Sequence, residues 1–324
     1  MTVPFTILLS SAGRRVSLLR SLRHAATAAG LDARVITCDL NWTAPAMHLA
    51  DAGFIVPRCT DPGFAAEVTA LCDSEHVDLV VPTIDTELPV WATLKPDLAT
   101  MGTTVAVSSP EAIAVAGDKR LTNRHCAESA IPCPRQAPLA DVQRDASGWR
   151  LPLIVKPAGG SSSVGLHRVT TWAALDAIPA DPALVVEETA PGIEHTVDVF
   201  VDRDGYAHGP VVRRRLEVRA GEVSKAQVVR DDLLASLAVR TVEALPGAYG
   251  PMNVQIFSDG PRAAVIEINA RFGGGCPLSF QAGGRHAEWL IREVARKEAP
   301  PAAPVIEYGL MMLRWDDEVF VRAD

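Results

Sequence analysis

Residues 264–271 read AVIEINAR, and this stretch decides the fold because its side chains alternate between two kinds of chemistry. Successive side chains of a β-strand point to opposite faces of the sheet. As a strand, this segment has one apolar face. The opposite face carries Val265, Glu267, Asn269 and Arg271, and so presents a carboxylate, an amide and a guanidinium. The pattern therefore predicts a strand with a buried face and a face that could bind a ligand.

The preceding run, residues 253–258, alternates in the same way, and a short turn connects the two runs into a predicted hairpin. The register we expect places Gln255 opposite Val265 and diagonal to Glu267. The side-chain oxygens of Gln255, Glu267 and Asn269 would then converge. A hard cation such as Mg²⁺ prefers a few protein oxygens, with phosphate and water completing its octahedron. An ordinary solvated strand face is the alternative interpretation.

A Gly/Ser-rich loop, PAGGSSSVG at residues 157–165, directly follows an apolar strand that ends at Lys156. Glycine and serine permit a tight turn whose backbone N–H groups can face phosphate oxygens, and the lysine adds a positive charge. The pattern is not a P-loop, because the lysine precedes the glycines and the loop leads into a strand. A plain hairpin loop is the alternative. The candidate phosphate-binding residues are Lys156, Gly159, Gly160, Ser161, Ser162, Ser163 and Gly165.

A third polar pattern is the stretch 185–195, VVEETAPGIEH. An apolar strand ends in Glu187 and Glu188, and Pro191-Gly192 turns the chain toward Glu194. These carboxylates could accept hydrogen bonds from an adenine amino group or a ribose hydroxyl. They could equally be surface acids.

Strand and helix signals alternate over the first ~110 residues, which predicts a parallel sheet with helices on both faces. The loop 10–14 connects a strand to a helix and could bind an anion at the helix N-terminus. Asp85 and Glu87 directly follow the buried strand 78–82, where loops of parallel sheets usually bind ligands. They could hold a substrate amine, or Asp85 could cap the next helix.

The expected elements of the first ~110 residues are strands at 5–9, 33–38, 78–82 and 104–107, and helices at 14–29, 62–72 and 110–116. The middle of the chain begins with a helix whose polar face carries Asp118, Lys119 and Arg120. The remainder, residues 187–324, is predicted to be antiparallel, with strands at 195–201, 210–218, 253–258 and 264–271 and a helix at 233–245.

Three consecutive arginines, Arg213, Arg214 and Arg215, invite a nucleic-acid interpretation. On a strand they alternate between faces, so at most two share a side. We expect one of them, Arg215, to face a substrate pocket and the others to be solvated.

Composition sets the outer limits of the function. The 324 residues suggest two or three domains, and 48% hydrophobic with 22% charged residues is ordinary for a globular protein. The net charge of −8 argues against nucleic acid or an anionic membrane as the main partner. None of the six cysteines forms a C-x-x-C pair, which predicts reduced thiols and a cytoplasmic location. The positive charge near the N-terminus follows the apolar run, unlike a secretory signal.

Taken in this order, the motifs resemble the ATP-grasp superfamily, and within it the group similar to half of the large subunit of carbamoyl-phosphate synthetase. The resemblance covers nearly the whole chain. It rests on Asp118-Lys119, Lys156 with its glycine loop, Glu187, Gly192–Glu194, Gln255, and Glu267-x-Asn269-x-Arg271 followed by Phe272, Gly273 and Gly274.

The resemblance implies an α/β and α+β fold. A Rossmann-like pre-ATP-grasp domain at 1–112 would carry the parallel sheet, and a two-part ATP-grasp unit would follow. In that unit, residues 113–186 would form a small lid subdomain and residues 187–324 the catalytic subdomain. A homodimer is a further expectation at the level of the family.

The resemblance also implies residue roles. Lys119 and Lys156 would contact the nucleotide phosphates, and the loop 159–165 would be the mobile lid over them. Glu187 and Glu188 would lie near adenine and Glu194 at the ribose. The metal ligands would be Gln255, Glu267 and Asn269, and the catalytic residues Arg271 and Lys156. The substrate candidates are Asp85, Glu87, Arg215, Gly273 and Gly274.

The implied activity is that of an ATP- and Mg²⁺-dependent carboxylate–amine ligase, with Mn²⁺ as an alternative ion. A small-molecule carboxylate would be activated as an acyl phosphate and then joined to an amine. One departure bears on this choice, because the synthetase itself has arginines where this chain has Lys119 and Lys156, whereas lysine is closer to the amide-forming ligases. The alternatives are a carbamoyl-phosphate-synthetase-like reaction through carboxyphosphate and a non-catalytic ATP-binding regulatory protein.

Overall fold

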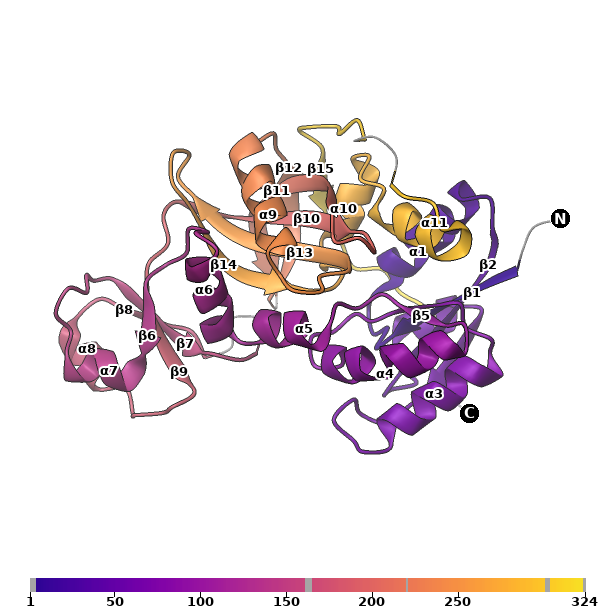
Figure 1. Cartoon of the computed structure of the whole chain (residues 1–324), viewed down its shortest axis with the longest axis horizontal. Helices are drawn as coiled ribbons and strands as arrows, with labels where there is room; N and C mark the ends of the chain where they lie inside the picture. Colours follow the sequence, from indigo (N-terminus) through magenta and orange to yellow (C-terminus); the bar gives the residue numbers. More distant parts are fainter. Residues whose placement is uncertain (1–3, 161–164, 220, 301–303, 323–324) are drawn as a thin grey trace.

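The computed structural model describes residues 4–160, 165–219, 221–300 and 304–322. Within these ranges the strands form three sheets (Figure 1). The first is fully parallel, in the order β3-β2-β1-β4-β5. Its strands are β1 (Pro4–Ser10), β2 (Asp32–Asp39), β3 (Ala52–Ile55), β4 (Leu79–Val81) and β5 (Thr104–Val105).

Helices cover both faces of this first sheet, as expected for buried parallel strands. Leu8 and Ile36 pack on one side with Phe64 and Trp91, whereas Ile7 packs on the other side with the apolar stripe of α1. The helices of this part are α1 (Val16–Ala28), α2 (Pro45–Leu49), α3 (Phe64–Ser74) and α4 (Leu88–Thr100). The predicted parallel sheet is therefore confirmed.

A small second sheet, in the order β6-β9-β7-β8, is antiparallel and projects from the rest of the molecule at the left of Figure 1. It has its own apolar cluster around Leu139, Leu153 and Val186. Its elements are β6 (Gln136–Pro138), α7 (Leu139–Arg144), β7 (Leu153–Pro157), β8 (His167–Val169), α8 (Trp172–Asp176) and β9 (Leu184–Glu188).

The third sheet is antiparallel and has the order β14-β13-β10-β11-β12-β15. Its strands are β10 (Ile193–Val201), β11 (Ala207–Arg219), β12 (Glu222–Val228), β13 (Gly250–Ser258), β14 (Ala263–Asn269) and β15 (Met311–Leu313). The helices around it are α5 (Pro110–Gly117), α6 (Lys119–Glu128), α9 (Asp232–Glu243), α10 (Cys276–Gln281) and α11 (His286–Arg296).

The two faces of the third sheet differ in chemistry. On one face, Val197 and Val254 pack with Leu234 and other apolar residues of α9. The opposite face is polar across four adjacent strands. It presents Glu194, Thr196 and Asp198 of β10, Arg213 and Arg215 of β11, Asn253 and Gln255 of β13, and Glu267 and Asn269 of β14. This polar face is where the predicted ligand-binding strand lies.

Three local expectations are corrected by the structure. The strand at 264–271 ends at Asn269, so Arg271 lies in the connection beyond it. Asp118 does not lie on a helix face, because it is the N-cap of α6, where its side chain accepts a hydrogen bond from Arg120 N and separates α5 from α6. The sequence interpretation also missed nine elements, namely α2, β3, α4, β6, α7, β12, α10, α11 and β15. In the described ranges, no helix is long and apolar enough to cross a bilayer.

Candidate active site

The β13–β14 hairpin brings three candidate metal ligands together. Gln255 lies directly opposite Glu267, and Asn253 lies opposite Asn269. The predicted register was wrong, because a β-bulge next to Gln255 makes one residue of β14 unpaired. The bulge turns Val265 to the apolar side, where it is buried with Ile268, rather than to the side of Glu267.

Glu267 lies among positive charges. Burial raises the pKa of its carboxyl, and the cations Lys119, Lys156 and Arg271 oppose that rise. Burial lowers the pKa of Lys119, an effect that Glu267 opposes and Lys156 increases. Two of the three cations have carboxylate partners of their own, Lys156 in Glu187 and Arg271 in Asp85. The oxygens of Glu267 itself accept no hydrogen bond from the described residues.

Hydrogen bonds connect the start of α6 to the Gly/Ser-rich loop. Lys119 N donates to the Ala158 carbonyl at 2.8 Å, and Lys119 Nζ donates to the Gly160 carbonyl at 2.6 Å. Asp118 also forms an isolated β-bridge with Gly159. Gly160 needs its conformational freedom here, because its φ is +86°. Ser161, Ser162 and Ser163 lie outside the described residues, so their predicted role stays a prediction.

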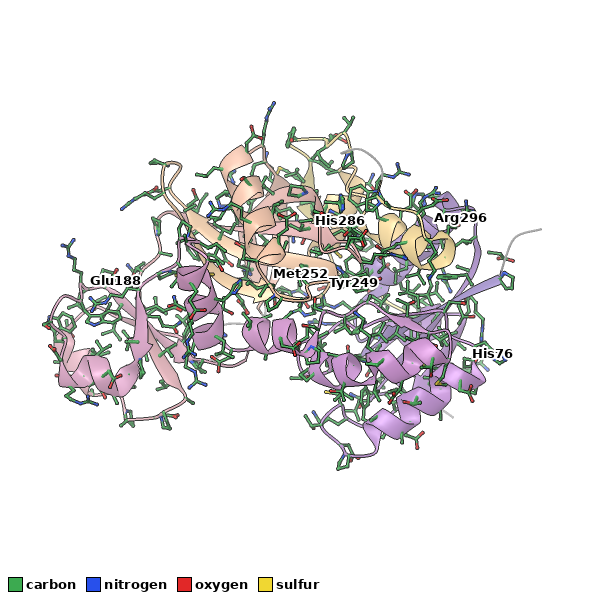
Figure 2. The ribbon with its side chains drawn as sticks, viewed as in Figure 1. His76, Glu188, Tyr249, Met252, His286 and Arg296 are labelled. Carbon is green, nitrogen blue, oxygen red and sulfur yellow. The ribbon has the colours of Figure 1, made fainter. Side chains whose placement is uncertain are left out.

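Lys156 and Glu187 form a buried ion pair on adjacent strands of the second sheet. Their Nζ and Oε2 atoms are 2.6 Å apart, and Gln136 Nε2 donates to Glu187 Oε1 at 2.6 Å. The Glu187 carboxylate thus holds Lys156 in place. Glu188 follows on the same strand, and its backbone N–H donates to the Arg135 carbonyl; Figure 2 labels its side chain on this small sheet.

Glu194 pairs with Arg215 across β10 and β11. Burial raises the pKa of Glu194, and Arg215 opposes the rise. The expectation that the neighbouring arginines are solvated was wrong for Arg213, which is only 1% exposed. Arg213 is paired with Asp198 at 2.7 Å, and Ser279 donates a hydrogen bond to the same carboxylate. A buried partner carboxylate is what permits a guanidinium to leave solvent.

Asp85 and Arg271 connect the first sheet to the third. Arg271 Nε and Nη2 donate to the two Asp85 oxygens at 2.8 and 2.6 Å, a bidentate arrangement. Arg271 Nη2 also donates to Asn269 Oδ1 at 3.0 Å. Arg271 is therefore held beside the candidate metal ligands by a residue of the other domain.

Glu87 does not fit its predicted role as a holder of the substrate amine. Its side chain is fully buried, and both oxygens already accept hydrogen bonds. The donors are Ser10 Oγ, Ser11 Oγ, Thr83 N, Ile84 N and Trp91 Nε1. Both oxygens are therefore unavailable to a substrate. Through these hydrogen bonds, Glu87 connects the loops that follow β1 and β4.

The glycines of the loop after β14 lie close to side chains of other chain segments. A Cβ on Gly273 would lie 3.0 Å from Asn253 Nδ2, and one on Gly274 would lie 2.8 Å from Arg15 Nη1. Sequence reasoning missed Arg15, Glu222 and Arg314, which lie around this loop. The signal for Arg15 was available in the pair of arginines that follows the first strand.

The donor set at the hairpin fits a phosphate-bound Mg²⁺. It combines one carboxylate, Glu267, with the amide oxygens of Gln255 and Asn269. No group of three or more His, Cys, Asp or Glu side chains that could hold a metal occurs in the described ranges. A hard cation bound through one carboxylate must take its remaining ligands from phosphate and water.

Two family models match this chain. One, described as "PylC-like, N-terminal domain", matches residues 7–106, and the other, "ATP-grasp in the biosynthetic pathway with Ter operon", matches residues 180–315. The D-alanine–D-alanine ligase of Rhodococcus jostii is 32% identical over 258 residues, which cover 67% of this chain and 69% of the relative.

Shorter matches leave part of the relatives unmatched. With the D-alanine–D-alanine ligase of Rhodococcus opacus, the chain is 32% identical over 178 residues, so it spans about half (48%) of that relative's length. The fold is similar to that of a Campylobacter jejuni biotin carboxylase, with a TM-score of 0.74, 17% identity, and coverage of 93% of this chain and 73% of that one.

The hairpin site lies within the residues that match the ATP-grasp model, and the parallel sheet precedes them in the chain. The chain belongs to the ATP-grasp family. The family predicted from the motifs is thereby confirmed.

Proposed function

We propose that this chain is an ATP-dependent carboxylate–amine ligase that forms an amide or peptide bond through an acyl phosphate and releases ADP and phosphate. The observation that carries the proposal is the β13–β14 hairpin, where Glu267 lies opposite Gln255, and Arg271 donates to Asn269 on the same strand. Glu267 accepts no hydrogen bond from the described residues, and Lys119, Lys156 and Arg271 act on its pKa as cations. Such a set suits the transfer of a phosphoryl group, where positioning and charge stabilisation supply most of the catalysis.

In this proposal, Mg²⁺ or Mn²⁺ bound with ATP supplies charge neutralisation at the phosphates, and Gln255, Glu267 and Asn269 would hold it. Lys119 and Lys156 bind phosphate oxygens. A substrate carboxylate oxygen attacks the γ-phosphorus, and the bond from this phosphorus to the ADP oxygen breaks. Arg271, held by Asp85, stabilises the negative charge on the transferred group.

The second step joins the amine. Its nitrogen attacks the acyl carbon, the bond from that carbon to the phosphate oxygen breaks, and the amine loses a proton to solvent. We infer no covalent intermediate on the chain. Glu187 positions Lys156 through their ion pair, and Glu188 and Glu194 remain our candidates for the adenine and ribose contacts.

The proposal includes the three units 1–112, 113–186 and 187–324, a cytoplasmic enzyme and a homodimer. Small molecules are its substrates, and the acidic net charge of −8 supports neither nucleic acid nor membrane as a partner.

The test is the release of ADP and phosphate from Mg²⁺-ATP with a panel of amino acids, dipeptides, hydroxy acids and bicarbonate. We expect release that requires an acid and an amine together and is lost in Glu267→Ala. The matched control is Glu111→Ala at an exposed glutamate of α5, which should behave as wild type. Release with bicarbonate alone would favour the carboxyphosphate reaction, and AMP with pyrophosphate would refute the acyl-phosphate mechanism.

A further inference from the structure

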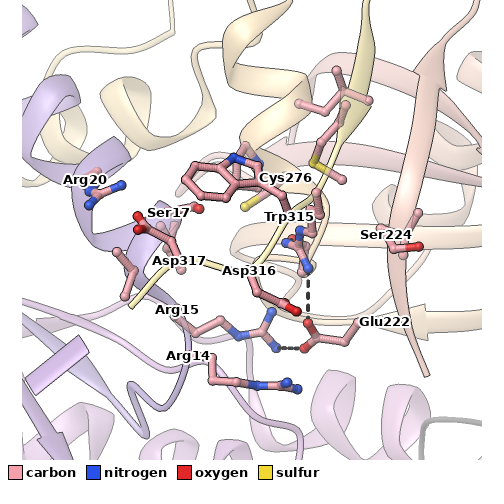
Figure 3. Close-up of a pocket in the computed structure, with 18 of the residues that line it drawn as sticks. Arg14, Arg15, Ser17, Arg20, Glu222, Ser224, Cys276, Trp315, Asp316 and Asp317 are labelled. Carbon is pink, nitrogen blue, oxygen red and sulfur yellow. Dashed lines mark hydrogen bonds and ion pairs between the residues drawn. The ribbon is translucent and has the colours of Figure 1, made fainter. Parts of the chain in front are cut away.

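A cavity of about 790 Å³ lies between the loop after β1, the loop after β14 and the segment after β15 (Figure 3). Its volume is in the range of small-molecule sites, ~300–1,000 Å³. Five guanidinium groups line it, those of Arg14, Arg15, Arg20, Arg219 and Arg314. They come from the loop after β1 and the start of α1, from the end of β11, and from the segment directly after β15, so the cavity is formed by the assembled fold and not by one local run of basic residues.

The wall has more positive than negative charge. Glu222 is shared between Arg15 at 3.3 Å and Arg314 at 3.2 Å. Arg14 has no ion-pair partner within the described part of the chain, and Figure 3 shows its side chain beside Arg15. Together with the three acids of the segment after β15, the wall has five guanidinium groups against four carboxylates, an excess of one positive charge.

The other acids come from the segment that follows β15. Asp316, Asp317 and Glu318 line the cavity, and Asp316 pairs with Arg219 at 2.6 Å. This pair is well exposed, so its contribution to stability is small. The segment shows that several carboxylates fit among these guanidinium groups at once.

The cavity continues to the candidate active site. Gly273 and Gly274 line it and directly follow the Arg271 connection. Burial lowers the pKa of Arg15, Glu222 opposes this, and the positive charge of Arg271 lowers it further, which places the two guanidinium groups in one electrostatic environment. Ile84 also lines the cavity and precedes Asp85, the partner of Arg271.

We propose that this cavity binds the acid substrate, and that this acid carries at least two anionic groups. The inference rests on the proposed ligase function. One carboxylate lies at the Gly273 end, where Arg271 can reach the group to be activated. The second anionic group pairs with Arg14 and Arg314. Arg14 and Arg20 have no ion-pair partner among the described residues, so a monocarboxylate at the Gly273 end would leave both without a counter-charge. Guanidinium forks match carboxylate and phosphate oxygens equally well.

The first experiment compares matched ligands by equilibrium titration calorimetry of the full chain, with ATP and Mg²⁺ present. Succinate is compared with succinamate, and 3-phosphoglycerate with glycerate, so that each pair differs by one anionic group. We expect the dianion of at least one pair to bind ~10-fold more tightly, as a charge-assisted contact predicts. The pair that discriminates tells whether the second group is a carboxylate or a phosphate. Equal binding within both pairs, or binding of neither member, overturns the inference.

The second experiment tests the residues. Arg14→Gln should remove most of the discrimination between dianion and monoanion while leaving binding of the monoanion unchanged. Arg314→Gln should do the same, but Arg314 also donates to the Gly274 carbonyl and could affect folding, so Arg14→Gln decides. The matched control is Arg262→Gln in the β13–β14 turn, an arginine outside the cavity, which should keep full discrimination. Full discrimination in Arg14→Gln overturns the assignment of the second anionic group.

The two proposals fail separately. Selective dianion binding that depends on Arg14, without any ADP release on addition of amines, leaves the cavity assignment standing and refutes ligation of that acid. ADP release that depends on Glu267 but shows no preference for dianions supports the ligase and refutes the dianionic substrate.

Discussion

Two carboxylates, one in each of the large domains, show how the same chemical group can serve the fold or the ligand. Burial raises the pKa of both Glu87 and Glu267. Glu87 lies in the first domain among five hydrogen-bond donors, and both its oxygens are used. Glu267 lies on the third sheet among cations, with no hydrogen-bond donor among the described residues.

The difference teaches how to separate structural from functional charges in this molecule. A buried carboxylate whose two oxygens are both used by internal donors, as in Glu87, contributes to stability and has no lone pair left for a ligand. A partly buried group that faces opposite charges without contacting them is poised for a ligand. The comparison therefore predicts activity loss without stability loss at Glu267, and stability loss without activity loss at Glu87.

The largest expected effect is at Glu267. Glu267→Gln should lower the rate of ADP release by on the order of 10³-fold, because the neutral amide neither holds a cation as a carboxylate does nor balances the three nearby positive charges. Stability in urea should change little, since no internal hydrogen bond is lost. Wild-type activity in Glu267→Gln, or a strong loss of its stability, would contradict the assignment of Glu267 to ligand binding rather than to the fold.

The next largest expected effect is a loss of folding stability on substitution of Asp198. Asp198→Asn would leave Arg213 buried without its counter-charge, and breaking such a pair costs ~3 kcal/mol or more. Urea unfolding measures the loss. The exposed pair Arg262–Asp259 is the matched control, because solvent screens this pair and Asp259→Asn should destabilise the fold much less than Asp198→Asn. An equal loss of unfolding free energy in the two variants would show that burial of the Asp198–Arg213 pair does not determine its contribution to stability.

The sequence predicted the parallel sheet and the hairpin because both have strong local patterns. Period-2 alternation locates a strand, and it placed Glu267 and Asn269 on one face. It could not show the bulge that turned Val265 to the core, since a single unpaired residue depends on the partner strand. The sequence also could not show which side chains form ion pairs. Arg213, for example, pairs with Asp198 on a neighbouring strand.

The arginine-lined cavity was beyond sequence reasoning for a related reason. Its wall joins Arg14, Glu222 and Arg314, which are far apart in the chain and come together only when the sheets are assembled. The same holds for Asp85 and Arg271, 186 residues apart. Local motifs predict which residues are reactive, and only the tertiary structure shows which of them already have partners, as Glu87 does.

A substitution at Glu87 tests the opposite case, a carboxylate that serves the fold and not the ligand. Glu87→Gln should destabilise the fold by ~2 kcal/mol, because the amide NH₂ would face hydrogen-bond donors in a buried site. Urea unfolding checks this value. The KM for ATP should stay within a few-fold of wild type, as Glu87 contacts no ligand in our proposal. Unchanged stability together with a large rise in this KM would reverse the roles assigned to Glu87 and Glu267.

The smallest expected effect is a pH dependence from His286, a fully buried histidine of α11 that Figure 2 labels. Its Nε2–H donates to the Gly209 carbonyl at 2.6 Å, so the ring is satisfied in the neutral form. Burial lowers its pKa below the ordinary value of 6.5. The unfolded chain therefore takes up a proton first as the pH falls below 6.5, and stability is lost there.

His286→Gln should reduce that loss. The contribution of one such group is at most ~1.4 kcal/mol per pH unit, so urea unfolding at pH 7.5 and pH 5.5 can resolve the difference between wild type and variant. The exposed His167 on β8 is the matched control, because His167→Gln should keep the wild-type difference. Activity at pH 7.5 should be unchanged in both variants, since His286 satisfies its polar atom inside the fold, as Glu87 does. A loss of activity in folded His286→Gln would show that an internally satisfied group can still act on the site.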